Sequence, residues 1–151
     1  MTSGGGRKGN SMHSKVVWKG GMAFTGTADS SYLVPLDAGS SSGGKELGFR
    51  PLQLMAIGLV GCTGMDVISI LQKKRQEITS FEVSAAIQRA DQHPKVFTKI
   101  ILEYKVTGVN IDKNAVERAV KLSEEKYCGA RAMLQHSAEI SNRIIIEEEG
   151  N

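Results

Sequence analysis

Cys62 and Cys128 are the residues of this 151-residue chain with the clearest capacity for covalent chemistry. A thiolate is a nucleophile, and two neighbouring thiols can cycle between the reduced and the disulfide form. The two cysteines lie 66 residues apart, so only the fold can bring them together. They form no CxxC motif, and with three scattered histidines they lack the spacing of a zinc site, so we expect neither a metal nor a cofactor.

Charged residues stand close to both cysteines along the chain. Asp66 follows Cys62 by one helical turn, and an ionised carboxylate there raises the pKa of a thiol. We therefore expect Asp66 to be a polar group bonded to nearby backbone or to a basic residue across an interface. Arg131 follows Cys128 by three residues and faces its thiol if that turn is helical. Composition alone favours the plainer interpretation of Cys62, a small buried apolar side chain.

A long helix is the first element that must position these residues. Pro51 suits a first helical turn, and the helix is predicted to run to about Gln76, with the basic run Lys73–Arg75 complementing its dipole. Leu52–Leu71 is mostly apolar, but Asp66 in its middle is costly in lipid, so we predict a buried helix and no membrane span.

Three glycines weaken this helix by about 1 kcal/mol each relative to alanine. Either the close approach of another backbone or access of a ligand to Cys62 would offset that cost. The glycines are Gly58, Gly61 and Gly64.

Strands are predicted on both sides of the long helix, and the order βββ-α-ββ-αα-β indicates an α+β fold. The predicted strands are Ser14–Lys19, Met22–Ala28, Tyr32–Leu36, Glu77–Arg89, Val96–Thr107 and Ala138–Glu147. The further helices are one capped by Asp112 that runs through Tyr127, and a short one over Ala130–His136.

Composition predicts a single globular domain over residues 12–151, since 40% of the chain is hydrophobic and 23% is charged. Residues 1–11 hold four glycines and no apolar run after Met1, so we expect a disordered leader or an expression remnant. Much of the net charge of +3 comes from this leader, which argues against a nucleic-acid partner. We expect a cytoplasmic, reduced setting, because no signal peptide follows the basic residues of the leader.

The residues around the two cysteines resemble those of the OsmC/Ohr family of small thiol-dependent proteins. The resemblance is strongest to the YhfA-like branch of that family. The order of elements also matches, over about Met12 to Glu147. The motifs that carry the resemblance are Pro51-Leu52-Gln53-Leu54, Leu59-Val60-Gly61-Cys62, Glu125-Lys126-Tyr127-Cys128, Met22-Ala23-Phe24 and the run from Asp66 to Lys73.

The resemblance implies an OsmC-like fold, in which antiparallel sheets wrap around a long central helix and two chains form an intertwined homodimer. It also implies that Cys62 attacks an organic or hydrogen peroxide and becomes a sulfenic acid. Cys128 then condenses with the sulfenic acid to a disulfide, which a dithiol reductant reopens.

The chain departs from the hydroperoxide-resistance branch at two positions. Met22 stands at the expected arginine and Leu52 at the expected glutamate. The substitute cations that we consider are Arg131, Arg50 and Lys45, with Glu46 as a substitute carboxylate. Arg131 has the better chance, because it travels with Cys128, whereas Arg50 lies roughly 18 Å along a straight helix from Cys62. These departures leave open a non-catalytic homodimer of the same fold that binds a small molecule or senses redox state. A purely structural dimer is the third alternative.

Overall fold

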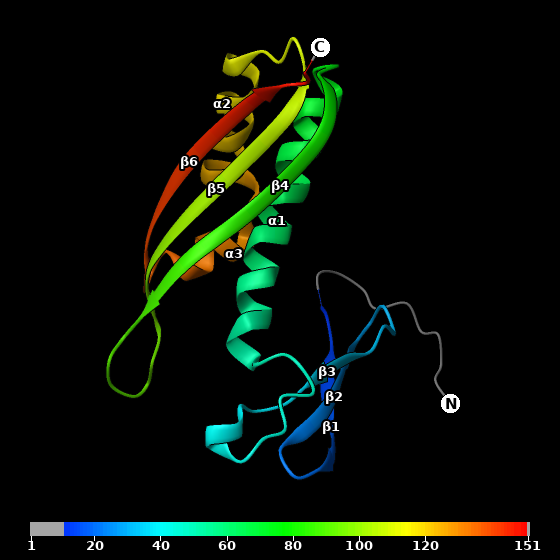
Figure 1. Ribbon diagram of the computed structural model, residues 1–151, viewed down its shortest axis with the longest axis vertical. Helices are drawn as coiled ribbons and strands as arrows, with labels where there is room; N and C mark the ends of the chain where they lie inside the picture. The colour runs from blue at the N-terminus through cyan, green and yellow to red at the C-terminus, as the bar shows by residue number, and fades with distance from the viewer. Residues whose placement is uncertain (1–10, 151) are drawn as a thin grey trace. The chain divides into compact units, whose positions relative to one another are not determined.

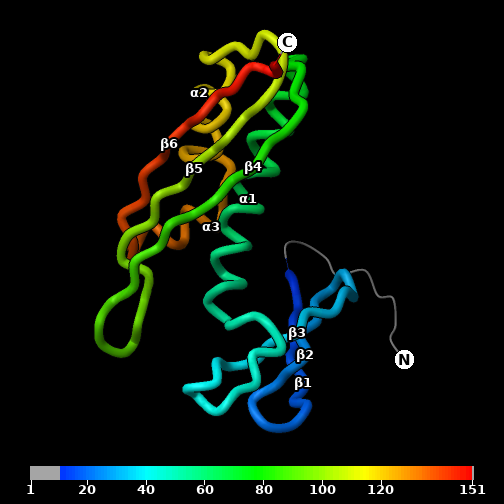
Figure 2. Tube along the Cα trace, in the orientation of Figure 1, coloured from blue at the N-terminus to red at the C-terminus, as the bar shows by residue number. Residues whose placement is uncertain are grey.

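The chain divides into two compact units, Met1–Leu54 and Met55–Asn151, in a computed structural model that describes residues 11–150. Figures 1 and 2 show the elements of both units coloured along the chain. Apart from Ser11, the expected leader lies outside the described residues, so its disorder stays a prediction. The single domain over 12–151 stays a prediction as well.

The first unit is built on an antiparallel sheet with strand order β1-β2-β3. The strands are β1 (Ser14–Gly20), β2 (Ala23–Ala28) and β3 (Val34–Leu36). Gly20 and Gly21 make the turn between β1 and β2 with φ of +104° and +56°, a region that glycine enters without steric cost. β3 is shorter than predicted, because its pairing with β2 begins at Val34 and leaves Tyr32 and Leu33 exposed outside the strand.

Asp37 fixes the loop that follows β3, which contains the short 3-10 turn η1 (Ser40–Ser42). Its buried carboxylate accepts backbone N–H groups from Ala38 at 2.7 Å and from Lys45 and Leu47 at 3.2 Å each. Burial alone would raise the pKa of Asp37, but these backbone hydrogen bonds outweigh it and hold the pKa below 3.8.

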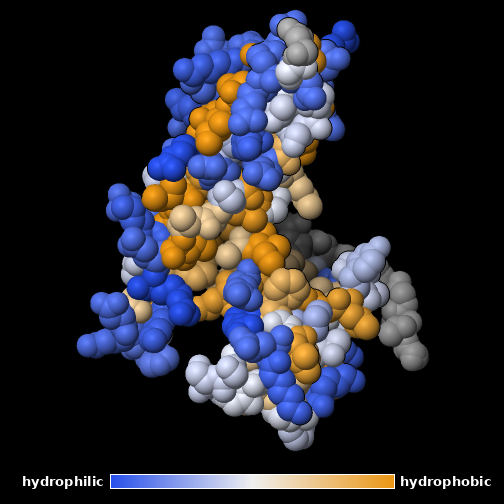
Figure 3. Space-filling model, in the orientation of Figure 1, coloured by the Kyte–Doolittle hydropathy of each residue, from blue (hydrophilic) through white to orange (hydrophobic). Residues whose placement is uncertain are grey.

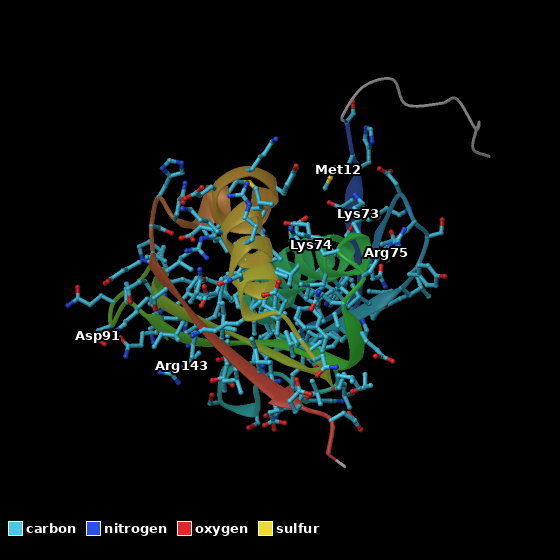
Figure 4. All side chains as sticks on the ribbon, turned by 90° about the horizontal axis from the view of Figure 1, so that it is seen from above. Met12, Lys73, Lys74, Arg75, Asp91 and Arg143 are labelled. Atoms are coloured by element: carbon cyan, nitrogen blue, oxygen red, sulfur yellow. The ribbon has the colours of Figure 1, made fainter. Side chains whose placement is uncertain are left out.

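The second unit packs its helices on one face of a sheet with strand order β4-β5-β6, as Figures 1 and 4 show from two directions. The elements are α1 (Pro51–Lys73), whose first turn belongs to the first unit, β4 (Glu77–Arg89), β5 (Phe97–Val109), α2 (Lys113–Leu122), the π-helical turn η2 (Ser123–Tyr127), α3 (Gly129–Leu134) and β6 (Glu139–Glu148). Two three-stranded sheets and a long helix confirm the predicted α+β class.

One strand corrects the expectation of purely antiparallel sheets. β4 and β5 pair antiparallel, but β6 runs parallel to β5, from Lys99 opposite Glu139 to Gly108 opposite Glu148. The physical reason is the connection between them. A parallel pair needs a crossover of a dozen or more residues, and α2, η2 and α3 supply it.

The core of the second unit lies between this sheet and the helices. From Ile100 to Gly108 every second residue of β5 is buried, while α1 and α2 each bury one face. The fully buried residues of β5 and α1 include Ile100, Leu102, Tyr104, Val106, Leu59, Thr63, Val67 and Leu71.

Outside that face, α1 is only partly covered by the chain. Met65 is 73% exposed, and a Cβ atom built on Gly58 or Gly61 would meet nothing within 4 Å. α1 is long and apolar enough to cross a membrane, and only 22% of its most apolar window is buried. Apolar side chains also gather on the surface where α1 adjoins β4, where residues such as Ile57 and Phe81 line a groove (Figure 3).

The basic end of α1 matches its prediction. Lys73, Lys74 and Arg75 are exposed and lie together where the helix ends (Figure 4). The helix stops slightly earlier than predicted, because Arg75 adopts a left-handed φ of +56°.

Candidate functional site

The second unit brings the two cysteines together despite the 66 residues between them. The Sγ atoms of Cys62 and Cys128 and a carboxylate oxygen of Asp66 all lie within 4.8 Å of one another. Cys62 is half-buried, Cys128 is buried, and both are free thiols. The site thus contains two adjacent thiols that are not bonded to each other.

Local structure on two elements accounts for this meeting. Cys62 and Asp66 are one turn apart on α1, which places both on the same face of the helix. Cys128 follows η2, and its backbone N–H donates to the Ser123 carbonyl at 2.8 Å. It also caps α3, because its Sγ accepts the backbone N–H of Arg131 at 3.3 Å. π-helical turns occur frequently at functional sites, and here one positions a cysteine.

A chain of buried hydroxyl groups supports Asp66 from within the core. The Tyr104 hydroxyl lies 2.7 Å from Thr63 Oγ1, which lies 2.8 Å from Ser123 Oγ. Ser123 Oγ in turn donates to Asp66 Oδ2 at 2.8 Å. Ser123 is thus a partner of Asp66 within the chain, and the expected bond to nearby backbone or to a basic residue across an interface stays a prediction. The Ser123 hydroxyl belongs to η2.

Arg131 touches the site with its backbone, whereas its guanidinium is engaged elsewhere. The side chain is almost fully buried and donates to Glu124 Oε1 and to Asn142 Oδ1, each at 2.7 Å, and to the Ile140 carbonyl at 3.2 Å. Asn142 also donates to Glu124 at 3.3 Å. The guanidinium therefore ties η2 and α3 to β6, and it does not hydrogen-bond to either thiol.

Electrostatics sets the protonation state of Cys128. Burial is the largest cause that raises the pKa of Cys128, and the neighbouring Cys62 thiol and Asp66 carboxylate raise it further. The backbone N–H of Arg131 lowers it in part, and the result is a pKa of about 11. Cys128 is consequently a neutral thiol at neutral pH. Burial likewise raises the pKa of Tyr104.

Arg50 and Met22 belong to the first unit. The Arg50 guanidinium donates to Glu46 Oε1 at 2.8 Å, an exposed pair on neighbouring loop residues. Met22 is 48% exposed. The role considered for Arg50 at the thiols stays a prediction.

Several residues of the site were missed by sequence reasoning. One signal was available, because a threonine inside an apolar helix competes with helix formation unless its hydroxyl is used. The other missed residues carry no local sequence signal, because they come to the site only through the packing of α1, η2 and the sheet. The missed residues are Thr63, Tyr104, Ser123, Glu124 and Asn142.

Comparison with known sequences gives two consistent matches. The family described as OsmC-like protein matches residues 43–142 of the chain. Protein YhfA of Escherichia coli strain K12 is 39% identical over 131 residues, which cover 87% of this chain and 95% of that protein.

Solved structures share the fold. A hypothetical protein from Aquifex aeolicus VF5 superimposes with a TM-score of 0.82 at 26% identity, covering 93% of this chain and 99% of that one. A protein from Legionella pneumophila, described as an organic hydroperoxide resistance protein OsmC, superimposes with a TM-score of 0.68 at 16% identity, covering 89% and 96% of the two chains. At that identity, the second likeness concerns the fold alone.

Proposed function

Because this chain belongs to the OsmC-like protein family, in its YhfA-like branch, we propose that it reduces organic or hydrogen peroxides through Cys62 and Cys128. Membership of this family supports a redox role in stress response, and the Legionella neighbour is described as acting in hydroperoxide resistance. The observation that carries the proposal is the presence of two free thiols whose Sγ atoms lie within 4.8 Å of each other.

The proposed reaction has three steps. The Cys62 thiolate attacks the distal oxygen of the hydroperoxide, the O–O bond breaks, and the alkoxide leaves as an alcohol once it gains a proton. Cys62 is then a sulfenic acid, which Cys128 attacks to form a disulfide and release water. A dithiol reductant restores both thiols by exchange and is itself oxidised to a disulfide.

The environments of the two thiols support this division of roles. Cys62 is half-buried, so a small peroxide can approach it, whereas Cys128 is buried and its pKa of about 11 keeps it protonated at neutral pH. Cys128 must lose its proton before it attacks. A carboxylate oxygen of Asp66 lies within 4.8 Å of the Cys128 Sγ atom, and it can accept that proton once the two groups come within hydrogen-bond reach.

Single cysteine variants test the proposal. Treated with cumene hydroperoxide, Cys128→Ser should accumulate a sulfenic acid that dimedone traps, and Cys62→Ser should not. The wild-type protein should form one intramolecular disulfide under the same conditions. Equal trapping in both variants, or none in either, would count against the assignment of roles.

We further propose that the protein works as a cytoplasmic homodimer, whose second copy covers α1. Support comes from the uncovered apolar part of α1, together with the open space around Gly58 and Gly61. Gly61→Leu places a bulky side chain there, and its Cβ atom meets nothing within 4 Å. It should therefore reduce the dimer in native-mass measurements, while Gly129→Ala, also at an open position, should not. A folded wild-type monomer at micromolar concentration would refute the homodimer.

Binding of a small molecule is the second candidate function. A cavity of about 510 Å³ in the first unit favours it. Its walls include Val16, Phe24 and Leu36, with Asp37 and Arg50 also in the lining, which suits a molecule with an apolar body and one polar end. Failure of both thiols to react with peroxides would leave this function as the better one.

A further inference from the structure

We propose that reduced Cys62 and Cys128, together with Asp66, form a binding site for one Zn²⁺ ion. The proposal requires only that both thiols are reduced, and it does not depend on peroxide reduction. It also revises the expectation that the chain binds no metal, which rested on the lack of a CxxC motif and of a histidine set. The third donor is a carboxylate that one turn of α1 places beside Cys62.

The donor atoms are close enough to share one ion. Zn²⁺ binds thiolate sulfur at about 2.3 Å and carboxylate oxygen at about 2.0–2.2 Å, so tetrahedral donors lie roughly 3.5–3.8 Å apart. The Sγ atoms and the Asp66 oxygen already lie within 4.8 Å of one another, so shifts of about 1 Å complete the geometry.

The donor chemistry selects the ion. Two thiolates disfavour Mg²⁺ and Ca²⁺, which take oxygen ligands, and they suit Zn²⁺, which also accepts a carboxylate. Three protein donors leave the fourth position for water, the usual arrangement of an open zinc site. Cys62 and Asp66 are half-buried, so water can reach that side.

Neighbouring groups hold two of the donors in place. Ser123 Oγ donates to Asp66 Oδ2 at 2.8 Å, and the backbone N–H of Arg131 donates to Cys128 Sγ at 3.3 Å. Hydrogen bonds of this kind orient metal ligands and are worth about 10–100-fold in metal affinity.

The balance of charge also favours a cation. Cys62, Cys128 and Asp66 can each carry a negative charge, and they face one another at short range. The guanidinium of Arg131, which could offset that charge, is bound to Glu124 and Asn142. A divalent ion neutralises the two thiolates and displaces protons from thiols as it binds, so binding is coupled to proton release.

Zinc titration of the reduced full chain, without oxygen and in competition with a chromophoric chelator, tests the site. We expect one Zn²⁺ per chain, with proton release, and strong ultraviolet absorption from sulfur-to-metal charge transfer when Cd²⁺ replaces Zn²⁺. Ser123→Ala should weaken affinity about 10–100-fold. Asp66→Asn should weaken it at least as much, because it removes a direct ligand while keeping an oxygen that accepts from Ser123. Asp91→Asn, at an exposed loop residue, is the matched control and should bind as the wild type does.

Oxidation provides a test that needs no variant. The wild-type chain oxidised by diamide should lose the site, and reduction should restore it. Equal zinc affinity of the reduced and oxidised chains, or of Asp66→Asn and Asp91→Asn, would overturn the proposal. Zinc binding without peroxide reactivity would refute the peroxidase alone, and peroxide reactivity without zinc binding would refute the metal site alone.

Discussion

Thr63 is the central link of the buried hydroxyl chain, and removal of its hydroxyl tests whether that chain stabilises the fold. Thr63→Val keeps the shape of the side chain but deletes the oxygen that lies 2.7 Å from Tyr104 and 2.8 Å from Ser123. Ser123 keeps its bond to Asp66. The Tyr104 hydroxyl, however, has no other hydrogen-bond partner among the described residues, and Tyr104 is fully buried.

The expected magnitude follows from that asymmetry. A buried hydroxyl left without a partner costs about 1–3 kcal/mol, whereas the hydrogen bond itself contributes only about 0.5–1.5 kcal/mol. Thr63→Val should therefore lower the free energy of unfolding by about 1–3 kcal/mol. Tyr104→Phe should cost about 0.5–1.5 kcal/mol, because it leaves Thr63 bonded to Ser123. Removing both hydroxyls leaves no orphaned partner, so the double variant should cost about 1–2 kcal/mol less than the sum of the singles.

Urea unfolding of the four proteins closes this double-mutant cycle. All four need the same chain concentration, because dissociation of an oligomer would make stability depend on it. Thr63→Ser is the control that keeps the hydroxyl and loses only a methyl group. Strict additivity of Thr63→Val and Tyr104→Phe would refute the argument, since it would mean that the two hydroxyls do not depend on each other.

Three further changes probe the electrostatics. Cys62→Ala should lower the pKa of Cys128 from about 11, while burial keeps that pKa above 9.0. The pH dependence of iodoacetamide alkylation measures it. An unchanged pKa would show that Cys62 does not raise the pKa of Cys128. Arg131→Met should lower the free energy of unfolding in urea by about 1–3 kcal/mol. This is less than the 3–5 kcal/mol expected for a wholly buried ion pair, because Glu124 is 38% exposed. An unchanged free energy of unfolding would contradict the observed pairing. Asp37→Asn should be less stable than the wild type at pH 7. Because the folded pKa of Asp37 is lowered, that difference should shrink as the pH falls below 3.8, and a difference independent of pH would exclude the carboxylate as its source.

The elements of the fold were predictable because their signals are local. Alternation marked Glu77–Arg89 as a strand with its bounds unchanged, and Asp112 caps α2 by accepting the backbone N–H of Asn114 at 2.9 Å. The direction of β6 was not predictable in this way. It depends on where the crossover returns the chain to the sheet, and the residues within the strand carry no signal for that position.

The site was predictable only in part, for the same reason. The resemblance indicated that Cys62 and Cys128 belong together, and the two thiols are indeed adjacent. The helix spacing that puts Asp66 beside Cys62 was also visible, but its partner was not. Ser123 lies 57 residues further along the chain, and it reaches Asp66 only because η2 packs against α1.

Ser123 couples the two halves of the site. Its hydroxyl holds the Asp66 carboxylate, and its carbonyl accepts the backbone N–H of Cys128, so one residue fixes the positions of both. Disulfide formation must bring the two sulfur atoms to about 2.05 Å, which is far closer than two unbonded thiols approach. We expect the movement to fall on Cys128, the extended residue at which the π-helical turn ends. Any shift of that turn also moves Ser123, and through it Asp66. We therefore expect the oxidation state of the thiols and the position of the carboxylate to be linked, as either a resolving cysteine or a metal site open only in the reduced state would require.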